Sequence, residues 1–162
     1  MSNETVIAAC AVVIAIASLV VSIYQTHAIR QHNRHSVRPM LQIDQSWGVG
    51  RRAGIRLINP GLGPAIIVDS TVTIDGIEVG DWSKLGVDQI LEGQSTPINV
   101  VTFTPGTVIP RDYDKFLISV ASYDPETHIK FLRLANQQLT LTIFYESLYG
   151  GEHLTATHSP LP

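Results

Sequence analysis

Cysteine is nearly absent from this sequence, because Cys10 is the only one among 162 residues. A single cysteine cannot form an internal disulfide, so covalent cross-links cannot stabilise the fold. A chain of about this length can bury roughly two thirds of the surface that its unfolded form exposes. We therefore expect one domain with a self-sufficient hydrophobic core.

Charge is also missing from a long N-terminal stretch, between Glu4 and Arg30. Residues 6–24 read VIAACAVVIAIASLVVSIY and lack the polar stripe of a core helix that has one exposed face. A helix of this length extends about 28 Å, close to the hydrocarbon thickness of a bilayer. The sequence therefore predicts a transmembrane helix over residues 6–24, with residues 1–5 as an N-terminal tail.

Parts of this stretch resemble two processing signals, a signal-peptidase site and a lipoprotein box. In each case the sequence lacks one element that the signal requires. The segment before Ser18 could be a signal-peptidase site, yet no Lys or Arg precedes the apolar run. The segment before Cys10 could be a lipoprotein box, yet too few residues precede it to supply the required apolar segment. We interpret residues 6–24 as a permanent anchor.

Basic residues follow the predicted span and indicate its orientation. Arg30, Arg34 and Arg38 are spaced by four residues, which places them on neighbouring turns of one helix, and Pro39 ends that helix. We expect a basic juxtamembrane helix over residues 25–38, whose arginines contact anionic headgroups at the membrane surface. Because basic flanks stay in the cytoplasm, the N-terminus is predicted to lie outside and the C-terminal body inside.

Small residues form a seam along the span. They recur in alternating steps of three and four, the spacing at which two helices approach closely in lipid. The members of this seam are Ala8, Ala11, Ala15, Ser18 and Ser22. The pattern predicts self-association of the span, which would make the protein a homo-oligomer.

Basic residues are scarce in the remainder of the chain. Residues 39–162 contain eight Lys and Arg against thirteen Asp and Glu, a net charge of −5. An acidic body without a basic stripe is a poor ligand for a polyanion. Nucleic acid is therefore excluded as an expected partner.

The same region has the periodicity of β-strands. Its sharpest signal is Asp75-Gly76, because both residues tolerate the positive φ that a two-residue hairpin turn requires. Runs rich in Ile, Val and Thr, separated by turn residues, predict strands at 40–45, 54–58, 65–74, 77–79, 98–103, 116–121, 139–145 and 153–157.

Two short helices interrupt the predicted strands. One is expected at residues 81–91, and a second begins with Asp124 as its cap and Pro125 in its first turn and continues to Ala135. The predicted fold class is therefore mainly β. An N-terminal transmembrane helix is followed, over residues 39–162, by an immunoglobulin-like antiparallel β-sandwich with one or two short helices.

Recognisable catalytic motifs are lacking. Residues 59–64, NPGLGP, have the glycines of a phosphate-binding loop, but a strand-forming run follows where such a loop needs a helix. Ser147 lacks a nucleophile elbow, and the histidines after the span have no neighbouring carboxylate or cysteine to complete a metal site. We therefore expect no catalytic residues, no metal ligands and no cofactor, and a protein that is not an enzyme.

Three motifs, taken together, resemble a known group of proteins. They are residues 38–41 (RPML), 59–65 (NPGLGPA) and 145–150 (YESLYG). In this order, as R-P-x-L, N-x-G-x-G-P-A and Y-x-x-x-Y-G, they resemble small, uncharacterised single-span bacterial membrane proteins. The resemblance implies a bacterial membrane setting and brings no activity or catalytic residues with it.

Together these features favour one function. We expect a membrane-anchored binding or scaffolding module in the bacterial inner membrane, whose β-sandwich faces the cytoplasm and binds a protein partner through loops or strand edges. Two alternatives stay open at this point. One is an outward-facing sensor, if the basic flank does not set the orientation, and the other is a hydrolase or metal-dependent enzyme with a site built from distant residues.

Overall fold

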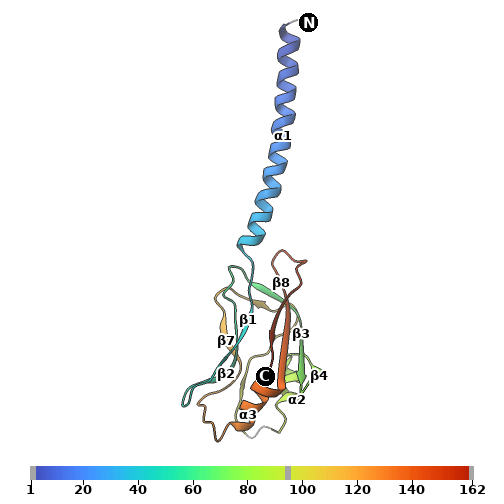
Figure 1. The fold of residues 1–162 in the computed structure, drawn as a ribbon. Coiled ribbons are helices and arrows are strands. Elements are labelled where there is room, and N and C mark those ends of the chain that lie inside the picture. Colours follow the sequence, from blue (N-terminus) through green and yellow to red (C-terminus); the bar gives the residue numbers. More distant parts are fainter. Residues whose placement is uncertain (1–2, 94–95, 161–162) are drawn as a thin grey trace. The chain divides into compact units, whose positions relative to one another are not determined.

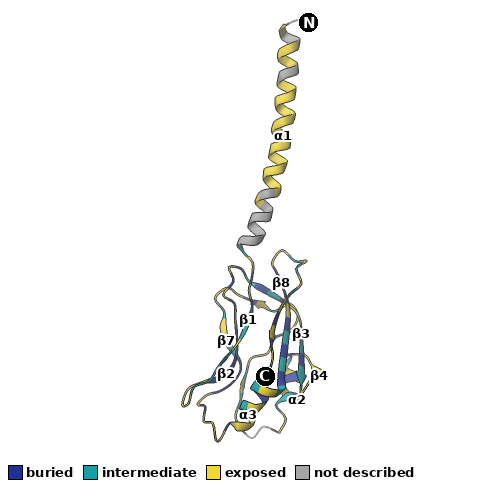
Figure 2. Cartoon of the chain, in the orientation of Figure 1, coloured by how far each residue is buried: buried dark blue, intermediate teal, exposed yellow. Residues whose placement is uncertain are grey.

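The computed structural model describes residues 3–93 and 96–160 and divides the chain into two compact units, Met1–Ser36 and Val37–Pro162. The first unit contains a single helix, α1 (Asn3–Ser36), shown in Figure 1. Its segment Val6–His27 is long and apolar enough, by length and composition, to cross a membrane. The side chains described on α1 are exposed (Figure 2).

The ends of α1 differ from the expected boundaries. The helix begins at Asn3, inside the expected tail, and ends at Ser36. Arg38, which the spacing places on the juxtamembrane helix, therefore belongs to the second unit. The physical reason is that Pro39 disfavours helical geometry at the residue before it, and the carbonyl oxygen of Arg38 instead accepts a hydrogen bond from the backbone N–H of Leu62 (3.1 Å).

The second unit, which we call the body, consists mainly of strands in two antiparallel sheets, as the sequence predicts at this coarse level. The first sheet has the order β1-β2-β7-β5, with β1 (Gln42–Ser46), β2 (Ala53–Ile58), β7 (Asp114–Val120) and β5 (Asn99–Val100). The second has the order β4-β3-β8-β9, with β4 (Ile77–Gly80), β3 (Ala65–Ile74), β8 (Leu139–Ser147), β9 (Leu154–His158), and with β6 (Val108–Ile109) paired to β3.

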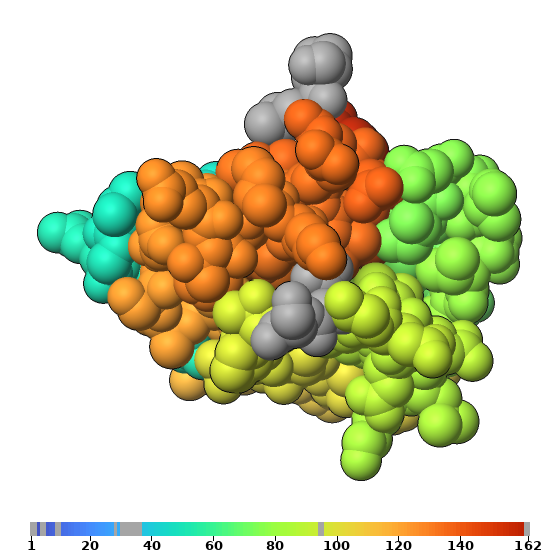
Figure 3. All heavy atoms as spheres, turned by 90° about the horizontal axis from the view of Figure 1, so that it is seen from below, coloured from blue at the N-terminus to red at the C-terminus, as the bar shows by residue number. Residues whose placement is uncertain are grey.

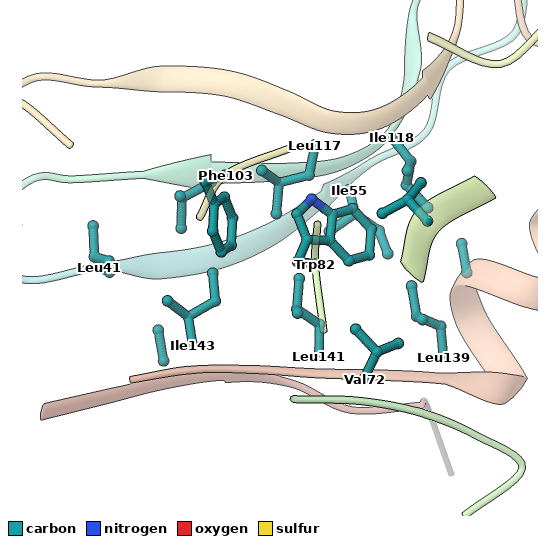
Figure 4. Packing of buried hydrophobic residues seen from close by; sticks show 14 of the residues in the cluster. Leu41, Ile55, Val72, Trp82, Phe103, Leu117, Ile118, Leu139, Leu141 and Ile143 are labelled. Atoms are coloured by element: carbon teal, nitrogen blue, oxygen red, sulfur yellow. The ribbon is translucent and has the colours of Figure 1, made fainter. Parts of the chain in front are cut away.

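Trp82 lies at the centre of the core that the two sheets share. Its ring is fully buried and packs between side chains such as Ile55 of the first sheet and Leu141 of the second (Figure 4). A buried tryptophan needs partners for its polar atoms. The backbone N–H of Trp82 donates to Ser70 Oγ (3.0 Å), and its Nε1–H donates to the carbonyl oxygen of Val101 (2.8 Å). The largest side chain of the core is therefore fixed by hydrogen bonds as well as by packing.

The Asp75-Gly76 hairpin is confirmed. Ile74 and Ile77 are paired across the turn, and the two residues between them have φ angles of 51° and 80°. Positive φ at both central positions matches the twist of the flanking strands. Local sequence chemistry is sufficient to specify this turn.

The helices of the body are short. α2 (Lys84–Ile90) is capped by Ser83, whose Oγ accepts a hydrogen bond from the backbone N–H of Gly86 (3.3 Å). α3 (Ile129–Arg133) continues directly into a π-helical turn, η1 (Leu134–Gln138). Figure 3 shows these segments, yellow-green for α2 and orange for α3 and η1, on the end of the body that also carries the green β3–β4 hairpin.

The predicted start of the second helix is wrong. The carboxylate of Asp124 accepts hydrogen bonds from the backbone N–H groups of Glu126 (3.4 Å) and Thr127 (3.2 Å), as a cap would, but these residues form a turn. The α-helix begins only at Ile129. His128 explains the delay, because its Nδ1 accepts a hydrogen bond from the backbone N–H of Asp124 (3.0 Å) and so stabilises a separate four-residue loop.

His158 connects the sheets at one side of the body. This buried residue ends β9, and its Nε2 lies 2.9 Å from the carbonyl oxygen of Ala135 and 3.4 Å from the Nε2 of Gln45 on β1. Burial lowers the pKa of His158, and the hydrogen bond to Ala135 opposes this effect in part. The folded state therefore favours neutral imidazole, and the stability that depends on it falls as the pH drops below the ordinary histidine pKa of about 6.5.

Candidate functional site

The glycine-rich loop between β2 and β3 holds the segment through which the chain enters the body. Asn59, directly after β2, has a side chain that is 1% exposed. Its Oδ1 accepts hydrogen bonds from the backbone N–H groups of Met40 (3.1 Å) and Gly61 (3.2 Å). Its Nδ2 donates to the carbonyl oxygens of Gly63 (3.0 Å), Pro110 (3.1 Å) and Ile109 (3.3 Å). One amide thus binds three separate backbone segments.

The two glycines of this loop allow a close backbone approach. A Cβ atom on Gly63 would lie 1.8 Å from the carbonyl oxygen of Val37, and one on Gly61 would lie 2.3 Å from the backbone nitrogen of Met40. Both distances are far below a van der Waals contact, so only glycine fits at either position. The glycines therefore serve contact with the entering chain, and the loop is followed by β3 rather than by a phosphate-binding helix.

Tyr145 of β8 completes the attachment from the second sheet. Its hydroxyl oxygen accepts a hydrogen bond from the backbone N–H of Leu41 (3.1 Å). Pro39 and Leu41 are both buried, so the entering segment is packed as well as hydrogen-bonded. We call this arrangement of Val37–Leu41, Asn59–Gly63 and Tyr145 the entry clamp. It brings together residues from the three stretches 38–41, 59–65 and 145–150 that the sequence singles out as motifs.

A groove lies beside the entry clamp, between the edge strands β1 and β9. It has a volume of about 610 Å³ and is lined by Leu41, Gln42, Ile43, Asp44, Ile58, Thr155, Ala156 and Thr157. The hydrogen bond from Leu41 to Tyr145 is near one end of these strands, and the contact between Gln45 and His158 is near the other. The groove is therefore open along the middle of β1 and β9, and the two sheets contact each other at both of its ends.

Charge on the first sheet is arranged around Arg56. Its guanidinium group bridges Asp44 of β1 (2.8 Å) and Asp114 of β7 (3.2 Å). The hydrogen bond from Arg56 lowers the pKa of Asp44, and the same bond raises the pKa of Arg56. These exposed cross-strand pairs link the edge strand β1 to its neighbour β2 and, through Arg56, to β7.

The residues expected to bind lipid or a second copy lie on or next to α1. All five seam residues are exposed: Ala8, Ala11, Ala15, Ser18 and Ser22. Arg38 is exposed as well, at the entry clamp, whereas the side chains of Arg30 and Arg34 fall outside the described residues. Within the described residues no group of three or more His, Cys, Asp or Glu side chains is placed to hold a metal ion.

Sequence reasoning found the components of the entry clamp without finding the clamp. The stretches 38–41, 59–65 and 145–150 attract attention as motifs, and the glycines of the second suggest φ values closed to other residues. The structure corrects this, because neither Gly61 nor Gly63 has a positive φ and both are required instead by the close approach of Val37 and Met40. The partners of that contact are distant in sequence, because Leu41 and Tyr145 are 104 residues apart.

No family model, curated protein or solved structure matches this chain.

We expect the isosteric substitution Asn59→Asp to loosen the entry clamp. It replaces the amide donor with a carboxylate oxygen that faces three carbonyl oxygens, and each buried group left unpaired costs about 1–3 kcal/mol. The free energy of unfolding of the full chain in nanodiscs should fall by about 3 kcal/mol or more in a urea titration followed by tryptophan fluorescence.

Asn99→Asp is the matched control, because Asn99 is exposed on β5. Its unfolding midpoint should stay close to that of the unsubstituted chain, since surface changes usually contribute within about 0.5 kcal/mol. Equal midpoints for the two variants would contradict the role assigned to Asn59.

Proposed function

We propose that this protein is a single-pass membrane protein of the bacterial inner membrane that presents a binding or scaffolding domain to the cytoplasm. The observation that carries the proposal is the direct succession of an apolar helix, a basic flank and the entry clamp. The body begins at Val37, immediately after α1 ends at Ser36. The protein would thus serve as a fixed point at the membrane to which another protein binds.

The entry clamp supports an anchoring role. A domain that only needed to remain near a membrane could be joined to its anchor by a flexible polar linker. Here the first residues of the body are instead buried or hydrogen-bonded, through the contacts of Met40 and Leu41 with Asn59 and Tyr145. Such an attachment resists a force that would separate the entering segment from the rest of the body. This resistance suits a scaffold.

We further propose an immunoglobulin-like plan for the body. The sheet order β1-β2-β7-β5 corresponds to strands A-B-E-D of that fold, and the order β4-β3-β8-β9 corresponds to C′-C-F-G. Domains of this plan bind partners through end loops or strand edges, and both are available here. The motif resemblance to small single-span bacterial membrane proteins supports the same setting.

We place the binding surface for the protein partner in the groove between β1 and β9. Edge strands offer backbone N–H and C=O groups to an added strand, and the groove lies between two such edges. Its lining combines apolar side chains such as Ile43 with hydroxyl groups such as Thr155 and Thr157. An extended segment of the partner, with alternating apolar and polar side chains, fits this chemistry.

The orientation can be tested with a C-terminal tag in intact spheroplasts. We expect protease added from outside to leave the tag intact until detergent permeabilises the membrane, because the basic flank retains the body in the cytoplasm. Digestion without detergent would support the alternative of an outward-facing sensor. Recovery of the chain in the soluble fraction after alkaline carbonate extraction would contradict the membrane anchor itself.

The groove can be tested by photo-crosslinking in the host cell. A photoreactive phenylalanine analogue at Gln42 or Thr157 should yield a crosslinked product with a second protein, because both positions line the groove. The matched control is Ile77, which is 70% exposed on the β3–β4 hairpin and lies outside the groove. Equal products at all three positions, or products of two copies of this chain only, would contradict binding of a partner in the groove.

We also propose that the span self-associates along its seam of small residues. The exposure of Ala15 and Ser18 on α1 is consistent with a contact surface in lipid. We expect Ala15→Leu or Ser18→Leu to weaken dimerisation of the full chain in a membrane two-hybrid reporter, since a larger side chain separates the backbones. Val13→Leu, off the seam, is the control and should leave the signal unchanged. If the seam variants also retain the signal, the seam does not mediate association.

A further inference from the structure

We propose that the end of the body that contains the entry clamp, here called the entry end, docks onto the lipid headgroup region through exposed apolar side chains. The contacting residues are Leu62, Leu148 and Tyr149, assisted by Met40 and Arg38. This inference rests on the membrane anchoring proposed above and extends it. The body would then not only be tethered to the bilayer but would also have one face fixed against it.

The apolar side chains of the entry end are strongly exposed. Leu148 is 61% exposed, Leu62 58%, Met40 54% and Tyr149 48%. Scattered exposed apolar residues are common on soluble proteins, but several at one end of a domain mark a contact surface. Ile77 (70%) and Leu85 (77%) are as exposed elsewhere on the body, so the entry end is distinguished by its short connection to the predicted span.

Backbone contacts place these residues at the same end of the body. Leu62 donates its backbone N–H to Arg38, in the segment next to Met40. Leu148 and Tyr149 follow Ser147, and Ser147 is paired with Ala65, the first residue of β3 after the glycine-rich loop. Figure 1 shows the loop before β3 and the loop after β8 at one end of the two sheets.

The short connection between the predicted span and the body argues that the bilayer is what contacts this surface. The membrane-spanning segment ends at His27 and the body begins at Val37. Residues 28–36 belong to α1, and as a helix they carry the chain at most about 14 Å past the span. The headgroup layer adds roughly 5–8 Å on each side of the hydrocarbon. Val37, the first residue of the entry end, is thus held within about 10 Å of the headgroups, so the effective concentration of this surface near the bilayer is on the order of millimolar or more.

The chemistry of the surface suits a membrane interface. Tyrosine has an apolar ring and a polar tip and is enriched where headgroups meet hydrocarbon, and leucine side chains insert below them. Arg38 adds one positive charge for lipid phosphates. Nearby acidic groups are engaged locally: Asp112 pairs with Arg111 (3.1 Å), and Glu146 Oε2 accepts a hydrogen bond from the backbone N–H of Gly151 (3.2 Å).

Site-directed spin labelling of the full chain tests this docking. In a Cys10→Ala background, single cysteines at Leu62, Leu148 and Ile77 receive a nitroxide, and the protein is reconstituted into vesicles of phosphatidylethanolamine and phosphatidylglycerol. Ile77 is the matched control, because it is an exposed aliphatic residue (70%, against 58% for Leu62 and 61% for Leu148) but lies on the hairpin at the far end of β3. Each labelled variant must keep the unfolding midpoint of the parent chain.

The measured quantity is relaxation of the nitroxide by a water-soluble nickel chelate and by oxygen, which concentrates in lipid. For labels at 62 and 148 we expect several-fold less relaxation by nickel, and more by oxygen, than for the label at 77. A label at Ile16, within the span, reports on the anchor independently. Equal nickel accessibility at 62, 148 and 77, together with a lipid-buried label at 16, would overturn the docking proposal alone. A label at 16 in water would overturn the membrane anchor as well.

Discussion

The side-chain amide of Asn59 is the interaction on which the start of the body depends. It combines an acceptor for the N–H groups of Met40 and Gly61 with a donor for the carbonyl groups of Gly63, in the same loop as Gly61, and of Pro110 in a third segment. A carboxylate has no donor and an aliphatic side chain has neither, so no residue of the same size replaces it. Because the amide is buried, each of its hydrogen bonds is formed in a setting of low dielectric, where an unpaired partner is costly.

This constraint gives the glycine-rich loop its composition. The loop must let the amide reach Met40 and must also bring its own backbone against Val37, which leaves no room for a Cβ at Gly61 or Gly63. Away from the loop, the core is arranged around Trp82, whose polar atoms are all bonded. The body thus combines a packed apolar centre, fixed through Trp82, with a polar attachment whose hydrogen bonds permit very little variation.

The sequence predicts local structure well and long-range attachment poorly. Strand β3 covers residues 65–74, as expected from its Ile, Val and Thr content, and the Asp75-Gly76 turn forms because its chemistry is local. The helix expected from Pro125 begins late because His128 binds back to Asp124, a competition that propensities do not reveal. The entry clamp was visible only as three unconnected motifs, since its contacts join positions up to 104 residues apart.

That separation also governs how the protein is made. The strands of the body leave the ribosome in chain order, so β1 and β2 are made long before β8. Leu41 must then wait until Tyr145 has left the exit tunnel before its backbone N–H finds its hydroxyl partner. β1 can pair with β2 as soon as both have been made, but the residue before it, Leu41, gains its partner on β8 only late. Until then the start of the first strand is open to chaperones or to neighbouring copies.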